Sequence, residues 1–245
     1  MKTKQEVSAI ITALKALYPD AQCSLDYGKD YELLFSVRLA AQCTDARVNL
    51  VTPALFARYP TLEAFAEADV DEVGQYIHSC GFWRAKARDI VASARMLREA
   101  FGGRVPDTME QLLRLPGVGR KTANLILGDI YGQEGYVCDT HCIRITNLLG
   151  LSQGKNPLQV EKQLRAVLPM DRANDFCHRL VLHGRDVCVA NRPKCDRCCM
   201  KDFCSFFQGD APSDKAATES KPSSKSASKP ARKKSAAKSS KSKTK

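Results

Sequence analysis

Four cysteines near the end of the chain have the type and spacing to bind a metal. They are spaced C-x6-C-x2-C-x5-C within 17 residues and comprise Cys188, Cys195, Cys198 and Cys204. The segment has few periodic apolar residues, so a bound metal would supply its folding energy. Zinc sites usually combine two short hooks far apart in sequence, whereas one short hook between two longer arcs suits an iron–sulfur cluster. The spacing favours a cluster but leaves zinc open, and the adjacent Cys199 leaves the third ligand open.

A lysine follows a glycine-rich turn upstream. Residues 115–121 are Leu-Pro-Gly-Val-Gly-Arg-Lys, between two helical segments. The turn brings backbone close to a ligand, and the next helix begins with unpaired N–H groups that suit a phosphate. We interpret this as a helix-hairpin-helix that binds DNA backbone without reading sequence. The predicted DNA contacts are Gly117, Val118, Gly119 and Arg120. Lys121 lies opposite the apolar stripe of its helix, so it is either a phosphate-neutralising cation or an amine nucleophile.

A carboxylate comes 18 residues after that lysine. Asp139 and Thr140 stand at the head of a helical run. The carboxylate is either a helix cap or a group that stabilises positive charge. Cys138 and Cys142 flank the Asp-Thr-His sequence, and we interpret them as small buried hydrophobic residues in preference to a second metal site.

Helical periodicity must position these groups. Apolar residues recur at helical spacing over 7–17 and 87–97, and the runs stop at Pro19 and at the glycines 102–103. Thr108 begins a short helix with a capping sequence. Strand-like alternation is nearly absent. The sequence predicts an all-α fold of roughly ten helices.

The C-terminal tail has a different composition from the body. Residues 211–245 contain no aromatic residue and no Leu, Ile, Val or Met. They hold eleven lysines or arginines against two acids, a net of +9 out of +11 for the whole chain. We expect a disordered basic tail over 209–245 that binds a polyanion, nucleic acid first; a solvated tail without a specific role is the alternative.

The start of the chain has no secretory signal pattern, and no run of 18 apolar residues occurs. Eleven cysteines without a secretion signal indicate a reducing compartment. We therefore expect no membrane association.

Taken together, the motifs resemble the endonuclease III family of DNA glycosylases and lyases. The resemblance covers roughly residues 1–207 and rests on four patterns: L-P-G-V-G-R-K-T-A-N at 115–124, D-T-H at 139–141, L-H-G-R at 182–185, and the four-cysteine spacing. It implies a two-lobed all-α helix-hairpin-helix glycosylase fold, consisting of a six-helix barrel and a [4Fe–4S] cluster lobe.

The resemblance also implies where the lobes lie. The barrel would span residues 23–134, with the hairpin at about 108–131. The discontinuous cluster lobe would join residues 1–22 to 135–208. The four cysteines would bind one [4Fe–4S] cluster.

The implied activity is removal of damaged bases, oxidised pyrimidines first, followed by nicking 3′ to the abasic site through β-elimination. Lys121 would be the nucleophile and Asp139 the catalytic aspartate. The partner would be double-stranded DNA with damaged bases or abasic sites. We expect a monomer that works with DNA inside the cell, in the cytoplasm and associated with the nucleoid if the source is bacterial.

Further DNA contacts follow from the same resemblance. Gln42 and Phe82 would fill the gap left by the extruded base, although a bulky aliphatic residue is more usual than Phe82. The alternative places both Phe82 and Trp83 in the core. We expect Asp45 to cap the next helix, in preference to a catalytic role. Arg192 and Lys194 in the cysteine loop would touch phosphates or only add solubilising charge.

Two other functions remain to be distinguished. Adenine-specific mismatch glycosylases share the framework but lack the hairpin lysine. A non-catalytic DNA-binding or redox-sensing module would use the hairpin and cluster only. Incision of abasic-site DNA by the purified chain separates these from a glycosylase/lyase.

Overall fold

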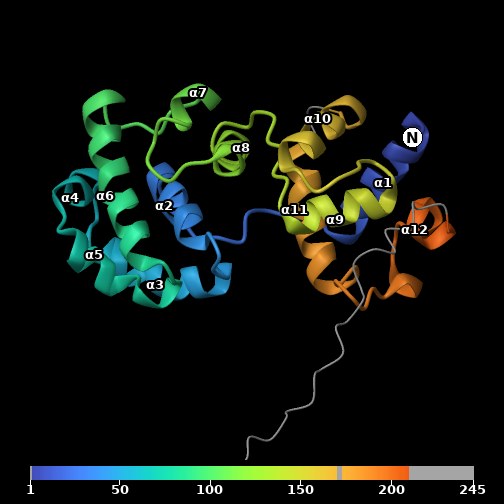
Figure 1. The fold of residues 1–245 in the computed structure, drawn as a ribbon, viewed down its shortest axis with the longest axis horizontal. Helices are drawn as coiled ribbons and strands as arrows, with labels where there is room; N and C mark the ends of the chain where they lie inside the picture. The colour runs from blue at the N-terminus through green and yellow to red at the C-terminus, as the bar shows by residue number, and fades with distance from the viewer. Residues whose placement is uncertain (1, 170–172, 210–245) are drawn as a thin grey trace, which may run out of the picture. The chain divides into compact units, whose positions relative to one another are not determined.

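The computed structural model describes residues 2–169 and 173–209, which belong to one compact unit, Met1–Ala211. Every regular element in the described ranges is a helix (Figure 1), which confirms the all-α prediction. None of these helices has an apolar stretch long enough to cross a membrane. The expected disorder of the basic tail concerns residues 210–245, which lie outside the described residues.

The helices follow one another with short connections. In chain order the α-helices are α1 (Lys4–Leu17), α2 (Asp30–Ala40), α3 (Asp45–Arg58), α4 (Leu62–Glu67), α5 (Val70–Tyr76), α6 (Trp83–Ala100), α7 (Met109–Leu112), α8 (Arg120–Asp129), α9 (Thr140–Leu149), α10 (Pro157–Val167), α11 (Ala173–Asp186) and α12 (Ser205–Gln208). Single 3₁₀ turns occur at η1 (His78–Cys80), η3 (Cys195–Arg197) and η4 (Lys201–Phe203).

Local sequence signals set several helix ends. Thr3 caps α1 in a reciprocal capping box with Glu6, and α1 ends two residues before Pro19. Thr108 accepts a hydrogen bond from the Gln111 amide and begins α7, as predicted. The glycines at 102–103 both have positive φ, and they follow the end of α6 because the left-handed conformation stops a helix there.

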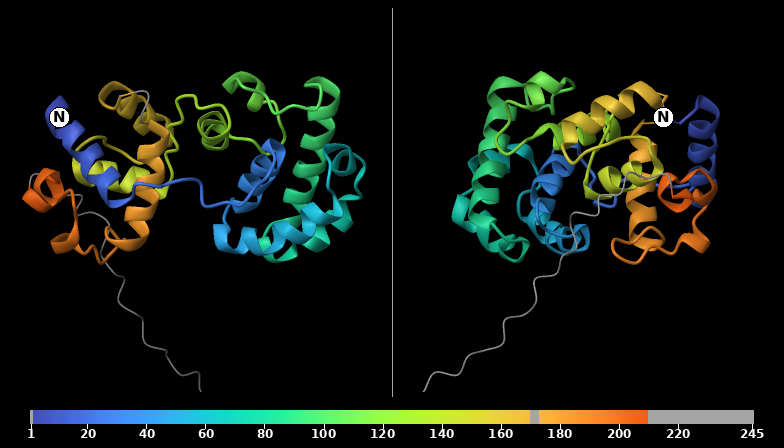
Figure 2. Two further views of the ribbon diagram at one scale, coloured as in Figure 1. Left: turned by 180° about the vertical axis from the view of Figure 1, so that it is seen from behind. Right: turned by 45° about the vertical axis from the view of Figure 1, so that its right-hand side comes forward.

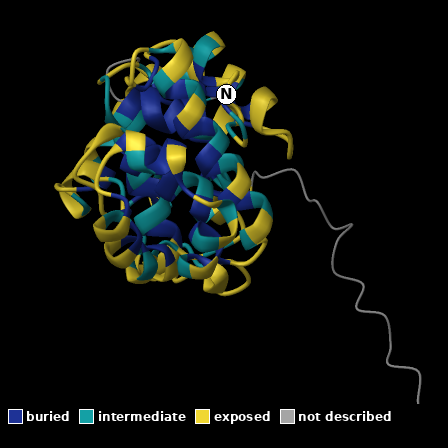
Figure 3. Cartoon of the chain, turned by 90° about the vertical axis from the view of Figure 1, so that its left-hand side faces the viewer, coloured by how far each residue is buried: buried dark blue, intermediate teal, exposed yellow. Residues whose placement is uncertain are grey.

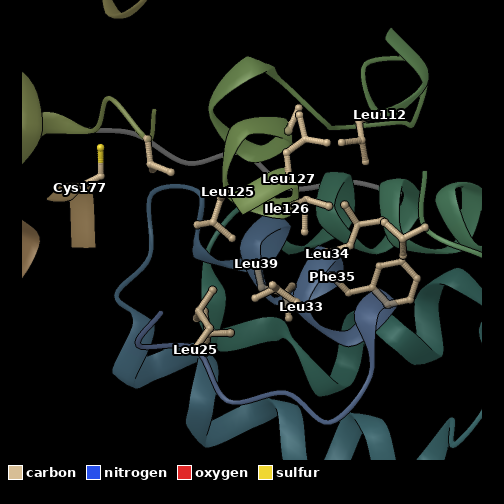
Figure 4. Close-up of a cluster of buried hydrophobic side chains, with 14 of the residues drawn as sticks. Leu25, Leu33, Leu34, Phe35, Leu39, Leu112, Leu125, Ile126, Leu127 and Cys177 are labelled. Carbon is tan, nitrogen blue, oxygen red and sulfur yellow. The ribbon is translucent and has the colours of Figure 1, made fainter. Parts of the chain in front are cut away.

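Helix α8, which carries Lys121, is anchored by its apolar face. It packs against α2 and α7. Leu125, Ile126 and Leu127 of α8 lie in the same cluster as Leu33 and Leu39 of α2 (Figure 4). Buried residues occupy the inner faces of the helices, while their outer faces are exposed (Figure 3). The hairpin is therefore anchored in the core through α8, while the first turn of α8 is exposed to solvent.

The N-terminal helix packs with segments far along the chain. Helix α1 contacts α11, and α11 contacts α9 (Figures 1 and 2). A separate set of contacts joins α4 and α5 to α6, and α2 to α3 and α6. Contacts between α8 and α11 join the two sets.

Candidate active site

A cavity of about 340 Å³ brings the predicted catalytic residues together. Lys121 from the first turn of α8 and Asp139 from the start of α9 both line it. Segments far apart in sequence complete the wall, and their polar side chains include Gln42, Asp45, His141, His178 and Arg185. The cavity therefore combines an amine, two carboxylates and two imidazoles at the N-terminal end of α8.

Lys121 is exposed, as expected for a residue opposite the apolar stripe of α8. The preceding turn is fixed by Gly117, whose φ is +73°. A Cβ at Gly117 would collide with the ion pair between Arg38 and Asp89, in which Arg38 Nε lies 2.7 Å from Asp89 Oδ2. Glycine is thus required at this position for two reasons, the positive φ angle and the close packing against the ion pair. Helix α8 begins directly after this turn, and Gly119 is its N-cap residue.

Asp139 is the N-cap of α9. Its Oδ1 accepts a hydrogen bond of 2.7 Å from the Cys142 amide. Among the described residues, none donates a hydrogen bond to the second oxygen, Oδ2. The capping role and the cavity-facing position are therefore compatible, because one oxygen serves the helix and the carboxylate still lines the cavity.

Asp45 is a cavity residue whose role sequence reasoning missed. The prediction that Asp45 caps α3 is wrong, because the N-cap is Thr44, whose side chain accepts a hydrogen bond from the Arg47 amide. Asp45 Oδ2 instead accepts hydrogen bonds from Ser24 Oγ at 2.5 Å and from Arg185 Nη2 at 2.8 Å. Burial alone would raise the pKa of Asp45, but these bonds and the nearby Lys121 charge outweigh it, so the pKa is lowered.

His141 is half-buried beside the two predicted catalytic groups. Burial lowers the pKa of His141, and the Asp139 charge opposes this shift while Lys121 and Arg185 add to it. A Cβ at Gly184 would collide with the imidazole, so the L-H-G-R sequence supplies a glycine where α11 approaches α9. The L-H-G-R sequence marks Gly184, but the sequence alone does not show that this glycine makes room for His141, because that depends on how α11 packs against α9.

Gln42 and Phe82 each have an unusual backbone conformation. Their φ angles are +55° and +48°, which non-glycine residues rarely adopt. Both are exposed, and Phe82 keeps 70% of its surface accessible. The core alternative for Phe82 is therefore wrong, whereas the neighbouring Trp83 packs against the core and lies 5.3 Å from the His78 ring.

A buried lysine fixes both of these loops. Lys86 is 1% exposed, and its Nζ donates hydrogen bonds of 2.7 Å to the carbonyls of Leu39 and Cys80. Leu39 precedes Gln42 by three residues, and Cys80 precedes Phe82 by two. One ammonium group thus anchors the backbone shortly before each of the two residues with positive φ.

Arg120 has a protein partner in this structure. Its Nε and Nη2 lie 2.7 and 2.8 Å from the two carboxylate oxygens of Glu161 in α10. Glu161 is buried and also accepts from Arg165 and Asn124. The bidentate pair raises the pKa of Arg120 and attaches the hairpin to α10. A phosphate contact by Arg120 stays a prediction.

The four cysteines of the loop after α11 line one small cavity. Its apolar wall includes Leu148, Val187 and Phe206. Cys199 is not among the lining residues, although it adjoins Cys198 in sequence. The cysteines that line it are Cys188, Cys195, Cys198 and Cys204.

Two polar side chains contact these thiols. Arg144 Nη1 lies 3.4 Å from Cys188 Sγ, and His183 Nε2 lies 3.4 Å from Cys198 Sγ. His183 is fully buried, and burial lowers its pKa to about 4. Across residues 2–169 and 173–209, no three histidine, cysteine or acidic side chains are arranged to hold a single metal ion.

The remaining predicted residues are two cations of the cysteine loop and two cysteines near Asp139. Arg192 is exposed, and Lys194 Nζ donates to the Asp186 carbonyl at 2.8 Å. Cys138 and Cys142 are buried in the core, as expected for small hydrophobic residues.

Comparisons with known proteins agree on one family. Residues 35–170 match the family of HhH-GPD superfamily base excision DNA repair proteins. Endonuclease III from Synechocystis sp. is 45% identical over 206 residues, which cover 84% of this chain and 94% of that protein. Endonuclease III from Escherichia coli is 39% identical over 197 residues, which cover 80% of this chain and 93% of that protein.

A solved structure agrees in fold as well as sequence. The trapped covalent intermediate of endonuclease III with DNA, in its estranged-adenine complex, superposes with a TM-score of 0.80 at 37% identity. The match covers 85% of this chain and 99% of that one. With the hairpin, the cavity and the four-cysteine loop in place, this chain belongs to the endonuclease III family of the HhH-GPD superfamily.

Proposed function

We propose that this chain is a bifunctional base-excision-repair enzyme, a DNA glycosylase that is also an abasic-site lyase. The observation that carries the proposal is the cavity that joins Lys121 to Asp139 beside the hairpin. A volume of about 340 Å³ is at the lower end for ligand sites and suits one extruded nucleotide. Extrusion costs a few kcal/mol and is cheaper for damaged bases, which favours their selection.

Base release uses the amine and the carboxylate. The neutral Lys121 amine attacks C1′ of the flipped nucleotide, and the bond from C1′ to the base breaks with its electron pair leaving on the base. Positive charge develops on the sugar, and the Asp139 carboxylate stabilises it. Before the attack, Asp139 helps to pass the Lys121 proton to solvent, so that Asp139 is again a carboxylate when charge develops on the sugar.

Strand cleavage follows from the covalent intermediate. Opening of the sugar ring gives a Schiff base between C1′ and the Lys121 nitrogen, and its iminium charge acidifies the C2′ proton. Removal of that proton sends an electron pair into the C2′–C3′ bond, and the 3′ phosphate leaves. Water then hydrolyses the imine and frees the lysine.

DNA binding divides between the hairpin and two wedge loops. The backbone N–H groups of Gly117 and Gly119 and the first turn of α8 face a phosphate, which binds without regard to sequence. Val118 lies between the two glycines and closes the turn, because its own N–H donates to the Leu115 carbonyl at 3.1 Å. Gln42 and Phe82 enter the duplex where the base has left, and their exposure and fixed backbone suit that role. Arg192 contacts phosphates from the cysteine loop, and Lys194 beside it does the same.

The cysteine loop holds a [4Fe–4S] cluster in this proposal. The ligands are Cys188, Cys195, Cys198 and Cys204, because all four thiols line one cavity with apolar walls. Arg144 and His183 suit thiolate ligands, since hydrogen bonds to the sulfurs stabilise their negative charge. The cluster, when bound, ties the loop into a rigid surface beside the DNA.

The lobe boundaries and cellular setting belong to the same proposal. The barrel comprises residues 23–134, and the cluster lobe joins 1–22 to 135–208. The enzyme is a monomer that acts on oxidised pyrimidines in double-stranded DNA inside the cell, in the cytoplasm with the nucleoid if the source is bacterial.

The deciding experiment is incision of a duplex with one abasic site by the purified chain. The proposal predicts a 3′ unsaturated aldehyde end from β-elimination. Base release without incision would favour an adenine mismatch glycosylase, and tight binding with neither reaction would favour a non-catalytic module. The presence of Lys121 in the cavity argues against both alternatives.

A further inference from the structure

One imidazole of the catalytic cavity has no role in the proposed function. His178 of α11 lines the cavity together with Lys121 and Asp139. The His178 side chain is 11% exposed, and its Nε2 lies 2.8 Å from Oδ1 of Asp129, the last residue of α8. Because an ionised carboxylate can only accept hydrogen bonds, Nε2 carries the hydrogen of this pair.

The Asp129 carboxylate holds the imidazole in one orientation. The Asp129 side chain is 8% exposed, and the same Oδ1 accepts a second hydrogen bond of 2.8 Å from Asn174 Nδ2. Asn174 packs so closely against α8 that a Cβ at Gly128 would collide with its Oδ1. The partner of His178 is therefore a buried carboxylate that is itself fixed between two helices.

The second ring nitrogen of His178 has no protein partner in the described part of the chain. None of those residues forms a hydrogen bond with Nδ1, and Nδ1 is not one of the buried polar atoms that lack a partner. In the neutral imidazole, a hydrogen on Nε2 makes Nδ1 an acceptor. The cavity therefore contains an oriented hydrogen-bond acceptor that the proposed chemistry leaves unused.

His178 lies at the far end of the cavity from Lys121. Its partner Asp129 follows Lys121 by eight residues in α8, which is about 12 Å along the helix axis. On α11, His178 precedes Arg185 by seven residues, so the two lie about 10 Å apart on the same face, and both line the cavity. A nucleotide bonded to Lys121 through C1′ would therefore extend its base toward His178.

We propose that His178 recognises the extruded base, with Nδ1 accepting a hydrogen bond from the ring N3–H of an oxidised uracil or thymine. This inference rests on the proposed function and deepens it. The base is attached to C1′ through N1, so N3–H lies on the edge of the ring that reaches toward the far end of the cavity. A base without an N–H there leaves Nδ1 unpaired and is rejected. Asp129 is a positioning residue, because it orients His178 without touching the base.

The first test separates the two ring nitrogens in the full chain as purified. His178→Gln keeps an N–H in place of Nε2, and so keeps the bond to Asp129, but has no group in place of Nδ1. Single-turnover release of 5-hydroxyuracil from a duplex should slow about tenfold, because one hydrogen bond to the substrate is lost. Incision of an abasic-site duplex should change by less than about twofold, since that substrate has no base. His178→Asn, which places a polar atom near Nδ1, should release the base faster than His178→Gln.

The second test changes the base, so it does not depend on how a variant folds. The wild type should release the N3-methyl derivative of 5-hydroxyuracil about tenfold more slowly than 5-hydroxyuracil itself. His178→Gln should release the two bases at the same rate, because the contact is missing with either. His78→Gln is the matched control, since His78 is exposed and does not line the cavity. It should leave the ratio of base release to abasic-site incision unchanged.

Three results would overturn the proposal. The first is equal slowing of base release and abasic-site incision in His178→Gln, which would make His178 a support of the fold only. The second is a wild type that releases both bases at the same rate, and the third is an N3-methyl effect that persists undiminished in His178→Gln. A wild type that does not incise abasic-site DNA would instead refute the proposed function, so the two failures are seen separately.

Discussion

Replacing Glu161 by glutamine should loosen the hairpin that presents Lys121. The Glu161 side chain is 3% exposed and accepts two hydrogen bonds from Arg120, two from Arg165 and one from Asn124. Glutamine keeps the volume but removes the charge. Breaking a buried ion pair from one side costs about 3–5 kcal/mol, because a charge is left without its partner.

The exposure of the two arginines reduces this figure. Arg120 and Arg165 are 44% and 36% exposed, so water can solvate the guanidinium groups after the change. We therefore expect Glu161→Gln to lower the free energy of unfolding by about 2–3 kcal/mol. At about 2–4 °C per kcal/mol for a body of this size, the melting temperature should fall by roughly 4–12 °C.

The loss should depend on pH in one direction. Burial alone raises the pKa of Glu161, but the hydrogen bonds and charges of Arg120 and Arg165 outweigh it, so the folded-state pKa is lowered. A carboxylate with a lowered pKa stabilises the fold above its unfolded pKa of about 4.3 and loses that effect as pH falls through the folded value. The difference between wild type and Glu161→Gln should therefore be constant between pH 7 and 5.5 and shrink below about pH 4.3.

Urea unfolding followed by circular dichroism measures this difference, with Arg120→Met as the matched variant from the other side of the pair. A double-mutant cycle should give a coupling of about 1 kcal/mol or more. A coupling near zero, or a loss below about 0.5 kcal/mol for Glu161→Gln, would refute the structural role. In that case Arg120→Met should lower the salt slope of DNA binding by about 0.9, as expected of a phosphate contact.

Three further predictions follow from the site and the charge pattern. Asp139→Asn should slow base release by about 10²–10³-fold with the circular dichroism spectrum unchanged, and wild-type turnover would leave Asp139 as a helix cap only. Cys199→Ser should leave iron at about four per chain, whereas Cys188→Ser should lower it; equal loss in both would show that Cys199 is a ligand. Deleting residues 211–245 should lower the log–log salt slope for undamaged duplex by roughly 2–5, and an unchanged slope would exclude DNA binding by the tail.

The helical fold and the placement of Lys121 and Asp139 at helix starts were predictable because they depend on local signals. Helical periodicity, the Thr108 cap and the glycines of the hairpin determine structure within a few residues. The wheel position of Lys121 indicates correctly that it faces away from the core.

The errors and omissions concern contacts across the fold. Asp45 occurs where a cap is expected, and only the approach of α11 brings Arg185 to it. Arg120 seemed a free cation because Glu161 is 41 residues away in the chain.

The central claim is that Lys121 forms a covalent bond with the sugar during the reaction. Borohydride reduction during turnover on an abasic-site duplex should trap a protein–DNA adduct, and mass spectrometry should locate it on the Lys121 peptide. Lys121→Ala should bind the duplex but give no adduct and no strand cleavage. Trapping by Lys121→Ala at the wild-type level, or an adduct on another residue, would contradict the account.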